Sequence, residues 1–366
     1  MAGAAGTDSE AMRGGVAGWA ADATAVDHAS LARVASGPVT SSSLDIVAIG
    51  DALVDVIATA DDSFVEQHGL PKGGMQLLTA EEADQLYEAM GPAREVSGGS
   101  AANSMASAAA LGLDVAFVGQ VADDQLGGIF AHDMVSLGVR FETPPVNAPP
   151  PTGRCLIVVT PDGQRTMNTC PGASHQLRAE VLDEKLIASA SVLLLEGYLW
   201  GPELPRQALI RAIEIARESG PEIAFTLSES VCLPGRREAL TQMIGGGGVD
   251  LLFMNDHEAL QLTGEDALDK ALDVLSAKVG TLVITRGAKG ALGIENGSAI
   301  EIPAAPVAQV VDTTGAGDLF AAGFLAGRCR GRPLEGCLQA GSLAAAEVIS
   351  HFGARPETDL RKVVNL

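Results

Sequence analysis

Toward its C-terminal end the chain reads Val311-Asp-Thr-Thr-Gly-Ala-Gly-Asp-Leu-Phe-Ala-Ala-Gly-Phe324. The turn at Gly315, Ala316 and Gly317 passes directly into an apolar run that predicts a helix over 316–329. The first amides of a helix have no acceptor within it, and the helix dipole adds partial positive charge there. These three residues therefore predict an anion hole suited to a phosphate in transfer.

Asp318 follows in the first turn of that helix, beside the predicted anion hole. A carboxylate at this point can take the proton of an attacking hydroxyl, as phosphoryl transfer requires, and Asp312 with the threonines after it can help to hold a cation. Alternatively, the glycines only permit a turn, and Asp318 only complements the helix dipole. The whole string is more specific than a common helix cap, and the chain contains no Walker A motif.

Composition narrows the classes of partner. The chain has 366 residues, 47% of them hydrophobic, so it can bury a sizeable core. Its formal net charge of −22 repels nucleic-acid phosphates and anionic lipid surfaces, so we expect neither nucleic-acid nor membrane partners. Bound nucleotide would need backbone amides, a few cations and a metal ion. The five cysteines form no C-x-x-C pair, which favours reduced thiols in a cytoplasmic protein.

Strand-length apolar runs alternate with helical patterns from Asp45 onward. This alternation predicts one α/β domain over residues 44–366, with a mostly parallel sheet covered by helices on both faces. Two β-like runs, 154–160 and 164–170, flank Pro161-Asp-Gly163 and predict a hairpin that belongs to a small β-rich lid. Residues 1–43, rich in Ala, Gly, Ser and Thr, are predicted to be a flexible extension with no part in catalysis.

Two features of the N-terminal half each allow two interpretations. Asp55 interrupts the apolar run 52–58, either as a strand-edge acid facing water or as an acid that accepts hydrogen bonds from a diol. Gly98 and Gly99 lead into a helix of small residues with Asn103 in its first turn. They mark either a tight packing seam between helix and sheet or the close approach of a ligand to the helix start.

Two separate motifs resemble those of a known family. Residues 312–318 with their helix resemble the C-terminal signature of the ribokinase-like (PfkB) carbohydrate kinases. A second stretch resembles the N-terminal signature of that family. It consists of Gly98 and Gly99 with Asn103, followed by Gly112, Val118-Gly119 and residues 123–127. The order and spacing agree over residues 44–360. The resemblance implies a Rossmann-like sheet with a β-rich lid, formed by parts of 52–80 and 140–172, over the acceptor sugar.

The resemblance also implies roles for single residues. Asp318 matches the catalytic base, and the turn before it matches the anion hole. The positions matching the ATP and Mg²⁺ site are Asn255, Glu258 (through water), Thr285, Arg286 and Gly287, and those matching a monovalent-cation loop, for an ion such as K⁺, are Asp312 and Thr314. ATP as co-substrate and Mg²⁺ as cofactor follow from the same resemblance. Asn255 could instead cap the helix that follows its strand, or it could serve both purposes.

Within the family the chain is most similar to adenosine kinases. Gly50-Asp-Ala-Leu-Val-Asp55 resembles their opening strand, whose last Asp binds the ribose hydroxyls, and this favours Asp55 as a ligand. An Arg at the position of Arg165 meets the phosphates from their lid, whereas a hairpin Arg is otherwise usually solvated. Leu199 stands where they carry a Phe that stacks on the base, with Tyr198 and Trp200 beside it. This departure leaves the base specificity open.

The predicted reaction is therefore transfer of the ATP γ-phosphoryl group to the 5′-hydroxyl of adenosine. The residues expected on the acceptor are Asp55, Gly98, Gly99, Asn103 and Leu199, and those that would flank the base from the lid are Met75, Leu77, Cys155 and Met167. One alternative is a sugar kinase of the same family acting on ribose, fructose or a related sugar. Another is a nucleoside-binding protein without activity, against which the intact Asp318 argues. A monomer and a homodimer both agree with the resemblance.

Overall fold

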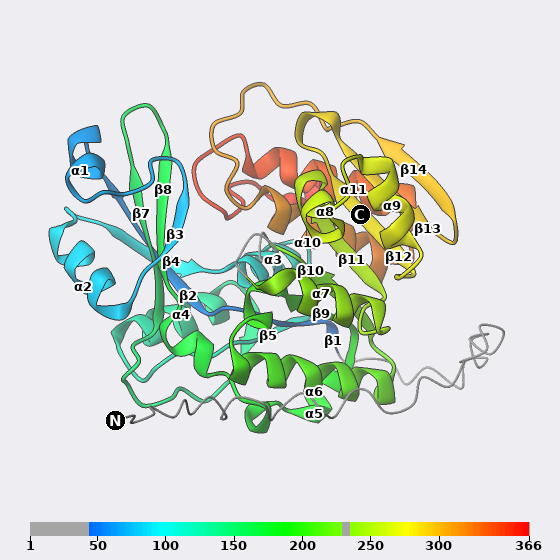
Figure 1. The fold of residues 1–366 in the computed structure, drawn as a ribbon, viewed down its shortest axis with the longest axis horizontal. Helices are drawn as coiled ribbons and strands as arrows, with labels where there is room; N and C mark the ends of the chain where they lie inside the picture. The colour runs from blue at the N-terminus through cyan, green and yellow to red at the C-terminus, as the bar shows by residue number, and fades with distance from the viewer. Residues whose placement is uncertain (1–43, 229–234, 366) are drawn as a thin grey trace, which may run out of the picture. The chain divides into compact units, whose positions relative to one another are not determined.

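The computed structural model describes residues 44–228 and 235–365, shown as a coloured ribbon in Figure 1. The predicted extension, residues 1–43, and Cys232 lie outside these ranges. The described strands form one nine-stranded and one five-stranded sheet. In the described part of the chain, no helix is both long enough and apolar enough to cross a membrane.

The nine-stranded sheet is the mostly parallel sheet that the alternating pattern predicts. Its order is β14 (Ser298–Ile302), β13 (Ala291–Glu295), β12 (Thr281–Thr285), β11 (Leu251–Asn255), β10 (Glu222–Thr226), β9 (Ala190–Glu196), β1 (Leu44–Ile49), β5 (Val115–Val118) and β6 (Val139–Phe141). Every neighbouring pair from β12 to β6 is parallel, whereas β13 is antiparallel to both β12 and β14. The hairpin of β13 and β14 turns through positive φ at Asn296 and Gly297, as an Asn-Gly turn does.

Alternate residues of each central strand face opposite sides of this sheet. On β1, Ile46 and Ala48 join one hydrophobic cluster and Val47 and Ile49 the other, all with no exposed surface. The first cluster packs under α3 (Ser100–Ala110), α4 (Gln125–Ser136), α10 (Ala316–Cys329), α11 (Leu334–Val348) and α12 (Leu360–Val364). The second packs under α5 (Glu184–Ala188), α6 (Glu203–Ser219), α7 (Arg236–Gly245), α8 (Asp256–Thr263) and α9 (Leu268–Ser276). Helices on both faces thus bury the sheet, as predicted.

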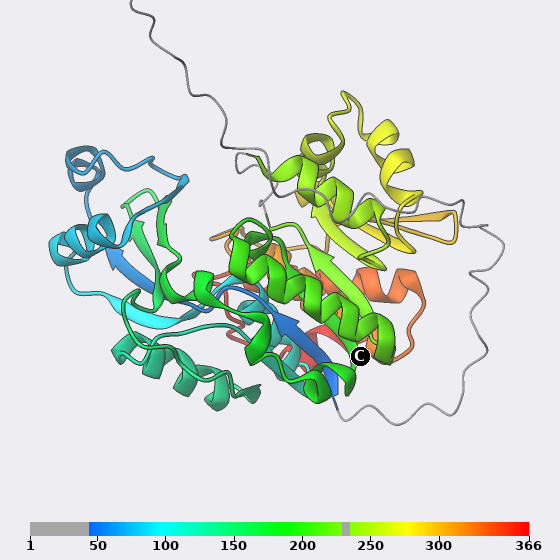
Figure 2. The same ribbon diagram turned by 60° about the horizontal axis from the view of Figure 1, so that its bottom comes forward.

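The five-stranded sheet has the order β3 (Met75–Leu77), β8 (Arg165–Cys170), β7 (Gly153–Val159), β2 (Leu53–Thr59) and β4 (Arg94–Gly98). It carries α1 (Asp62–Gln67) and α2 (Ala80–Ala89) and lies to one side of the larger sheet in both ribbon views (Figures 1 and 2). The predicted hairpin is confirmed as β7 and β8. The sequence did not predict β3, β4 or the 3-10 turns, which are Gly172–Gln176 (η1), Ala179–Val181 (η2), Gly197–Trp200 (η3) and Gly287–Lys289 (η5).

Only Gly50, Asp51 and Ala52 separate β1 from β2, so the chain crosses from one sheet to the other within three residues. A Cβ on Gly50 would lie 2.5 Å from Oε2 of Glu196 at the end of β9, so a side chain at this crossing would displace that acid. The crossing therefore fixes the five-stranded sheet beside the carboxyl ends of β1 and β9.

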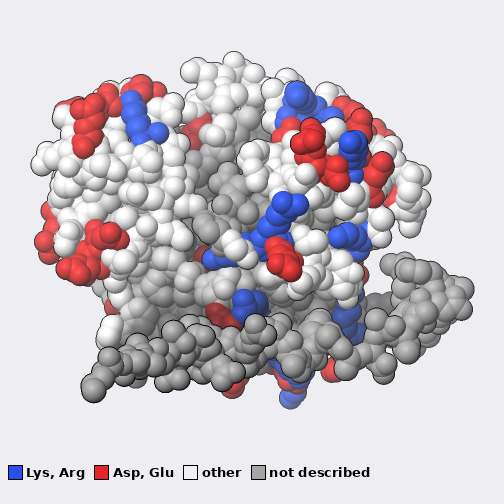
Figure 3. Space-filling model, in the orientation of Figure 1, with Lys and Arg blue, Asp and Glu red and all other residues white. Residues whose placement is uncertain are grey.

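Charge is distributed unevenly on the face drawn in Figure 3. Acidic side chains predominate over the five-stranded sheet, whereas acidic and basic side chains are interspersed over the helices of the larger sheet. On this face the excess of acid is therefore greatest over the five-stranded sheet.

Helices α10 and α11 pack with their backbones in close approach. A Cβ on Gly323 would lie 2.5 Å from the carbonyl oxygen of Ala340, and a Cβ on Gly341 would lie 2.7 Å from the carbonyl oxygen of Phe320. Since backbone atoms cannot move aside as side-chain ends do, these glycines set the distance between the two helices. The position of the α10 N-terminus depends on that distance.

We predict that Gly323→Ala lowers the free energy of unfolding by about 1–3 kcal/mol, because the added methyl overpacks the α10–α11 contact. Urea denaturation of the purified protein measures this change. Gly128→Ala is the matched control, because Gly128 is also helical and has open space around its Cβ position. A Gly323→Ala protein as stable as the Gly128→Ala protein would contradict the packing argument.

Candidate active site

Polar residues follow several parallel strands at one edge of the nine-stranded sheet. Asp51 comes two residues after β1, and Glu196, Asn255 and Thr285 end β9, β11 and β12. Because these strands are parallel, their carboxyl ends meet at the same edge, which is where open α/β sheets bind ligands. The N-termini of α3 and α10 come to the same place.

Asp318, in the first turn of α10, is held by the start of α3. The Ser100 hydroxyl donates to its Oδ1 at 2.6 Å, and Nδ2 of Asn103 donates to its Oδ2 at 3.0 Å. The Ser104 hydroxyl also donates to the Asp318 carbonyl at 3.1 Å. Oδ1 of Asn103 is buried without a protein partner in the described residues. The carboxylate is therefore fixed in orientation, and a polar atom beside it is left for a ligand.

The environment of Asp318 shifts its proton affinity. Burial raises the pKa of Asp318, whereas the hydrogen bonds from Ser100 and Asn103 and the charge of Arg355 oppose that shift. Arg355 lies in the segment after α11 and donates to the carbonyls of Ala102 and Ser97 at 3.0 and 2.9 Å. A half-buried guanidinium thus stands on the α3 side of this carboxylate. Nothing in the sequence around Arg355 pointed to that position.

Gly98 and Gly99 show why two glycines precede α3. A Cβ on Gly98 would overlap the Asp55 carboxyl, and one on Gly99 would overlap the Asp51 carbonyl. Gly99 also has a φ of 97°, which side chains disfavour. Both glycines therefore allow a close approach within the protein that brings Asp55 and Asp51 to the start of α3.

Asp55 lies on β2, between Val96 of β4 and Cys155 of β7 in register, and is half-buried. Burial raises the pKa of Asp55 to about 6, with the charges of Arg355 and Arg165 opposing the shift and that of Asp318 adding to it. Asp55 is thus not a solvated strand-edge acid. The charges of Asp55 and Asp318 act on each other, so a hydroxylated ligand that reached both would provide hydrogen-bond donors.

The turn before Asp318 opens onto a cavity of about 540 Å³. Gly315 adopts a φ of 77° as the N-cap of α10, and the Ala316 amide donates to the Thr313 carbonyl at 3.2 Å. The remaining first-turn amides have no acceptor inside the helix. The cavity is lined by Thr285, Gly287, Ala316, Gly317 and mostly apolar residues such as Val307 and Phe320. An anionic group at the helix start and a flat apolar group beside it would both fit here.

The remaining residues predicted for the ATP and Mg²⁺ site are Asn255, Glu258 and Arg286, and they lie in two different places. Asn255 and Glu258 form a capping box at the start of α8, in which each side chain accepts from the other residue's amide, at 2.7 and 2.6 Å. Asn255 therefore caps α8, which is one of the two roles that its sequence position predicted. The side chain of Arg286 pairs with Glu301 on β14 and does not line the 540 Å³ cavity. Its neighbours Thr285 and Gly287 do line that cavity.

Arg165 reaches from the five-stranded sheet to the loop before α10. Its Nη1 lies 2.8 Å from Oδ2 of Asp312, with both side chains less than a tenth exposed. Thr314 donates from its amide and its hydroxyl to Oδ1 of Asp312, and the Gly353 amide donates to Oδ2 at 2.8 Å. Although burial raises it, the pKa of Asp312 is lowered by these hydrogen bonds and by Arg165. Both carboxylate oxygens of Asp312 thus already accept from protein N–H and O–H groups, one of them on the Arg165 guanidinium. A monovalent cation does not fit against this carboxylate in this arrangement.

A smaller cavity of about 130 Å³ lies at the start of α3, where Ser100 donates to Asp318. Gly99 and Ser100 line it at the α3 end, and the lining residues from the five-stranded sheet include Met75, Leu77 and Met167. Tyr198 lines it, but Leu199 does not: Leu199 is fully buried in the core of the larger sheet. The 3-10 turn η3 sends these adjacent side chains in different directions, so Tyr198 and not Leu199 faces a ligand in this cavity.

Sequence reasoning missed several polar residues of this smaller cavity, namely Asp51, Ser100, His175, Glu196 and Arg236. Glu196 has no exposed surface, and its Oε1 is without a partner in the described residues. Burial, and next the charge of Asp51, raise the pKa of Glu196 well above its usual range. An acid closing the apolar run 191–195 was a visible signal of the same kind as Asp55. For His175 and Arg236 the sequence contained no comparable signal.

A family model described as pfkB family carbohydrate kinase matches residues 43–360. The chain belongs to this family. It has the ribokinase-like α/β fold that the two motifs predicted. Among solved structures, it resembles the adenosine kinase from Sinorhizobium meliloti at 44% identity and a TM-score of 0.83, over 88% of this chain and 98% of that one.

Two further relatives carry other names. A probable sugar kinase from Rhizobium etli CFN 42 is 42% identical, with a TM-score of 0.83 over 88% of this chain and 98% of that one. The guanosine-inosine kinase of Escherichia coli (strain K12) is 30% identical over 243 residues, which are 62% of this chain. The chain thus spans 56% of the length of that curated relative.

We predict that Arg165→Met and Asp312→Asn each lower the free energy of unfolding, by about 3–5 kcal/mol for the first, because one charge of a buried pair is left alone. The double variant should lose less than the sum of the two single losses. Urea denaturation of the four proteins gives the coupling. Additive losses would show that the two side chains do not interact in solution.

Proposed function

We propose that this protein transfers the γ-phosphoryl group of ATP to the 5′-hydroxyl of a ribonucleoside, with adenosine as its acceptor. One observation carries the proposal. The hydrogen bonds from Ser100 and Asn103 to Asp318 join the helix that lines the smaller cavity to the helix that lines the larger one. A carboxylate at this junction stands between a donor and an acceptor, where in-line transfer needs a base.

Each part of the site has a role in this reaction. The 540 Å³ cavity takes the adenine and ribose of ATP, and the first-turn amides of α10 take the transferred phosphoryl group. Asp318 takes the proton of the attacking hydroxyl. Asp55 accepts two hydrogen bonds from the ribose diol, and Oδ1 of Asn103 accepts a further one. The five-stranded sheet is the lid that excludes water from the transfer.

Mg²⁺ would neutralise charge on the ATP phosphates. In the described residues no group of three or more His, Cys, Asp or Glu side chains is placed to hold a metal ion. The donors present, a buried Glu258 in a capping box with Asn255, fit an ion that keeps its waters and takes its other ligands from phosphates. Glu258 would then act through water.

The acceptor assignment has support from both the pocket and the relatives. Tyr198 and the methionines from the five-stranded sheet give the smaller cavity an apolar wall that suits a base beyond the ribose. A structural relative at 44% identity is called an adenosine kinase. The second candidate is a sugar kinase, favoured by the name of the relative from Rhizobium etli. A sugar without a base would leave the apolar wall of the smaller cavity without a group to contact.

An ADP-release assay with Mg²⁺-ATP tests the proposal on adenosine, ribose and fructose. We expect adenosine to be turned over best and Asp318→Asn to lower kcat about 10²–10⁴-fold, since the base is lost, while acceptor binding is largely kept. Glu335→Gln is the matched control, because it removes an exposed acid from the first turn of α11, away from both cavities. Turnover of ribose or fructose without adenosine would refute the nucleoside assignment, and a near-normal Asp318→Asn rate would refute the base assignment.

The pH dependence of kcat/KM for the acceptor should show the ionisation of Asp55. Its pKa of about 6 means that the carboxylate, which is the form that accepts hydrogen bonds from a diol, is lost as the pH falls through 6. We therefore expect kcat/KM for the acceptor to rise between pH 5 and 7, since kcat/KM reports ionisations of the free enzyme. Asp55→Asn should remove this step in the profile and raise the acceptor KM. An unchanged profile in Asp55→Asn would assign the step to another group.

A further inference from the structure

The smaller cavity has a charged end, where the charges of Asp51, His175 and Arg236 act on one another. Ser100, which donates to Asp318, lines one part of it, and Asp51, His175 and Arg236 line it as well. Beyond the hydroxyls that Asp55 and Asn103 would bind, an acceptor in this cavity therefore meets a carboxylate, an imidazole and a guanidinium. An apolar wall alone would select by shape, whereas these groups select by hydrogen-bonding pattern.

Arg236 is held in place from one side. Its Nη1 donates to the Tyr198 carbonyl at 2.8 Å, and its guanidinium packs on Gly201, where a Cβ would overlap it. Gly201 has a φ of −80°, which any residue adopts, so its backbone does not require glycine. The missing side chain instead makes room for the guanidinium. Arg236 also lines the smaller cavity, and a guanidinium carries five N–H groups, so one that donates to the Tyr198 carbonyl has others that can meet a ligand there.

Asp51 supplies the complementary acceptor. Its Oδ1 accepts from the Ser174 hydroxyl at 2.7 Å, and a carboxylate has capacity for further donors. The side chain is 5% exposed. His175 follows Ser174, and burial lowers the pKa of its imidazole, so it faces the cavity as a neutral group. The charged end thus combines a fixed donor, Arg236, with a fixed acceptor, Asp51.

Purine bases differ in how they match this pair. A 6-oxopurine presents O6 and N7 as adjacent acceptors, the pattern that arginine binds with two N–H groups, and carries a donor at N1 beside O6. Adenine instead carries an amino group at position 6. This group is a donor, so it cannot accept from the guanidinium, which also only donates. The charged end therefore offers hypoxanthine or guanine hydrogen bonds that adenine cannot make, whereas the apolar wall of the same cavity can pack against either kind of purine.

We propose that Arg236, positioned by Tyr198 and Gly201, and Asp51 form a base-reading subsite that admits 6-oxopurine ribonucleosides as acceptors in addition to adenosine. This inference rests on the proposed nucleoside kinase function and extends its substrate class. Arg236 reads O6 and N7, and Asp51 accepts from N1–H. The reaction is otherwise unchanged: the 5′-oxygen bonds to the γ-phosphorus, ADP leaves, and Asp318 takes the hydroxyl proton.

The test compares kcat/KM for inosine, guanosine and adenosine in the wild type and in Arg236→Met. We expect the wild type to phosphorylate inosine or guanosine. Arg236→Met should lose about 5- to 150-fold in kcat/KM for these two, as expected when a paired contact to O6 and N7 is lost, and change far less for adenosine. The ratio of inosine to adenosine is the readout, because a general loss of structure would lower both.

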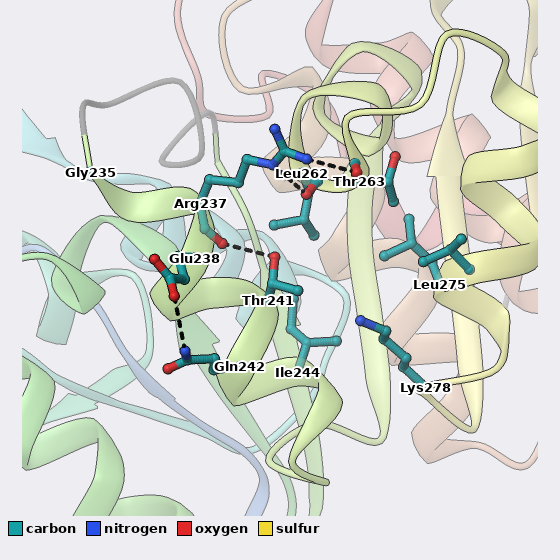
Figure 4. Close-up of a pocket in the computed structure, with 11 residues that line it drawn as sticks. Gly235, Arg237, Glu238, Thr241, Gln242, Ile244, Leu262, Thr263, Leu275 and Lys278 are labelled. Atoms are coloured by element: carbon teal, nitrogen blue, oxygen red, sulfur yellow. Dashed lines mark hydrogen bonds between the residues drawn. The ribbon is translucent and has the colours of Figure 1, made fainter. Parts of the chain in front are cut away.

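Arg237→Met is the matched control. Arg237 is the next residue of α7, but it donates to the carbonyls of Leu262 and Thr263 beside a separate pocket between α7, α8 and α9 (Figure 4). Its substitution should leave the inosine-to-adenosine ratio unchanged. Gly201→Ala is the second test variant: it keeps the backbone and displaces only the guanidinium, so it should shift the ratio in the same direction as Arg236→Met.

Three results would overturn the inference. These are wild-type turnover of adenosine but of neither 6-oxopurine nucleoside, an equal loss for all three nucleosides in both variants, or a ratio that also shifts in Arg237→Met. Each leaves the nucleoside kinase function standing. Turnover of ribose or fructose with no nucleoside turned over would instead overturn the proposed function, and the subsite with it.

Discussion

Asp318 receives hydrogen bonds on both carboxylate oxygens from the first turn of another helix. Ser100 and Asn103 begin α3, whose start is fixed by Gly98 and Gly99 against β2, while the start of α10 depends on its glycine contacts with α11. Hydrogen bonds to a charged acceptor are worth about 1.5–3 kcal/mol each, enough to offset part of the cost of burying the carboxylate. The relative position of the two cavities follows from this junction, because each helix lines one of them.

The site concentrates negative charge in a chain that already has an excess of it. Asp51, Asp55, Glu196 and Asp318 all have their pKa raised, first of all by burial. The cations that oppose these charges come from separate segments: Arg355 after α11, Arg165 on β8 and Arg236 at the start of α7. Because a formal charge of −22 provides no general attraction for ATP, these local guanidinium groups and the helix amides must provide it.

The parts of the molecule that follow from local pattern could be predicted, and those that follow from long-range packing could not. Strong alternation gave the parallel strands and their helices, and the Asn296-Gly297 turn gave its hairpin. Strand β4 was missed because Arg94–Gly98 has little apolar content. It is a strand because it pairs with β2, and local pattern does not reveal such pairing. Leu199 was misplaced because motif alignment does not show which way a 3-10 turn points each side chain. Arg355 enters the site through hydrogen bonds to residues more than 250 positions away, which no spacing rule reveals.

Arg165 links the two sheets energetically as well as spatially. It belongs to the same sheet as Asp55, and its ion pair with Asp312 crosses to the loop that begins α10. Moving that sheet to admit an acceptor would leave two buried charges unpaired, which costs several kcal/mol unless another anion replaces Asp312 as the partner. Phosphate oxygens of a nucleotide at the α10 N-terminus are such a partner for a guanidinium, with better bidentate geometry than a shared carboxylate oxygen. Occupancy of the larger cavity would therefore lower the cost of moving the sheet that covers the smaller one.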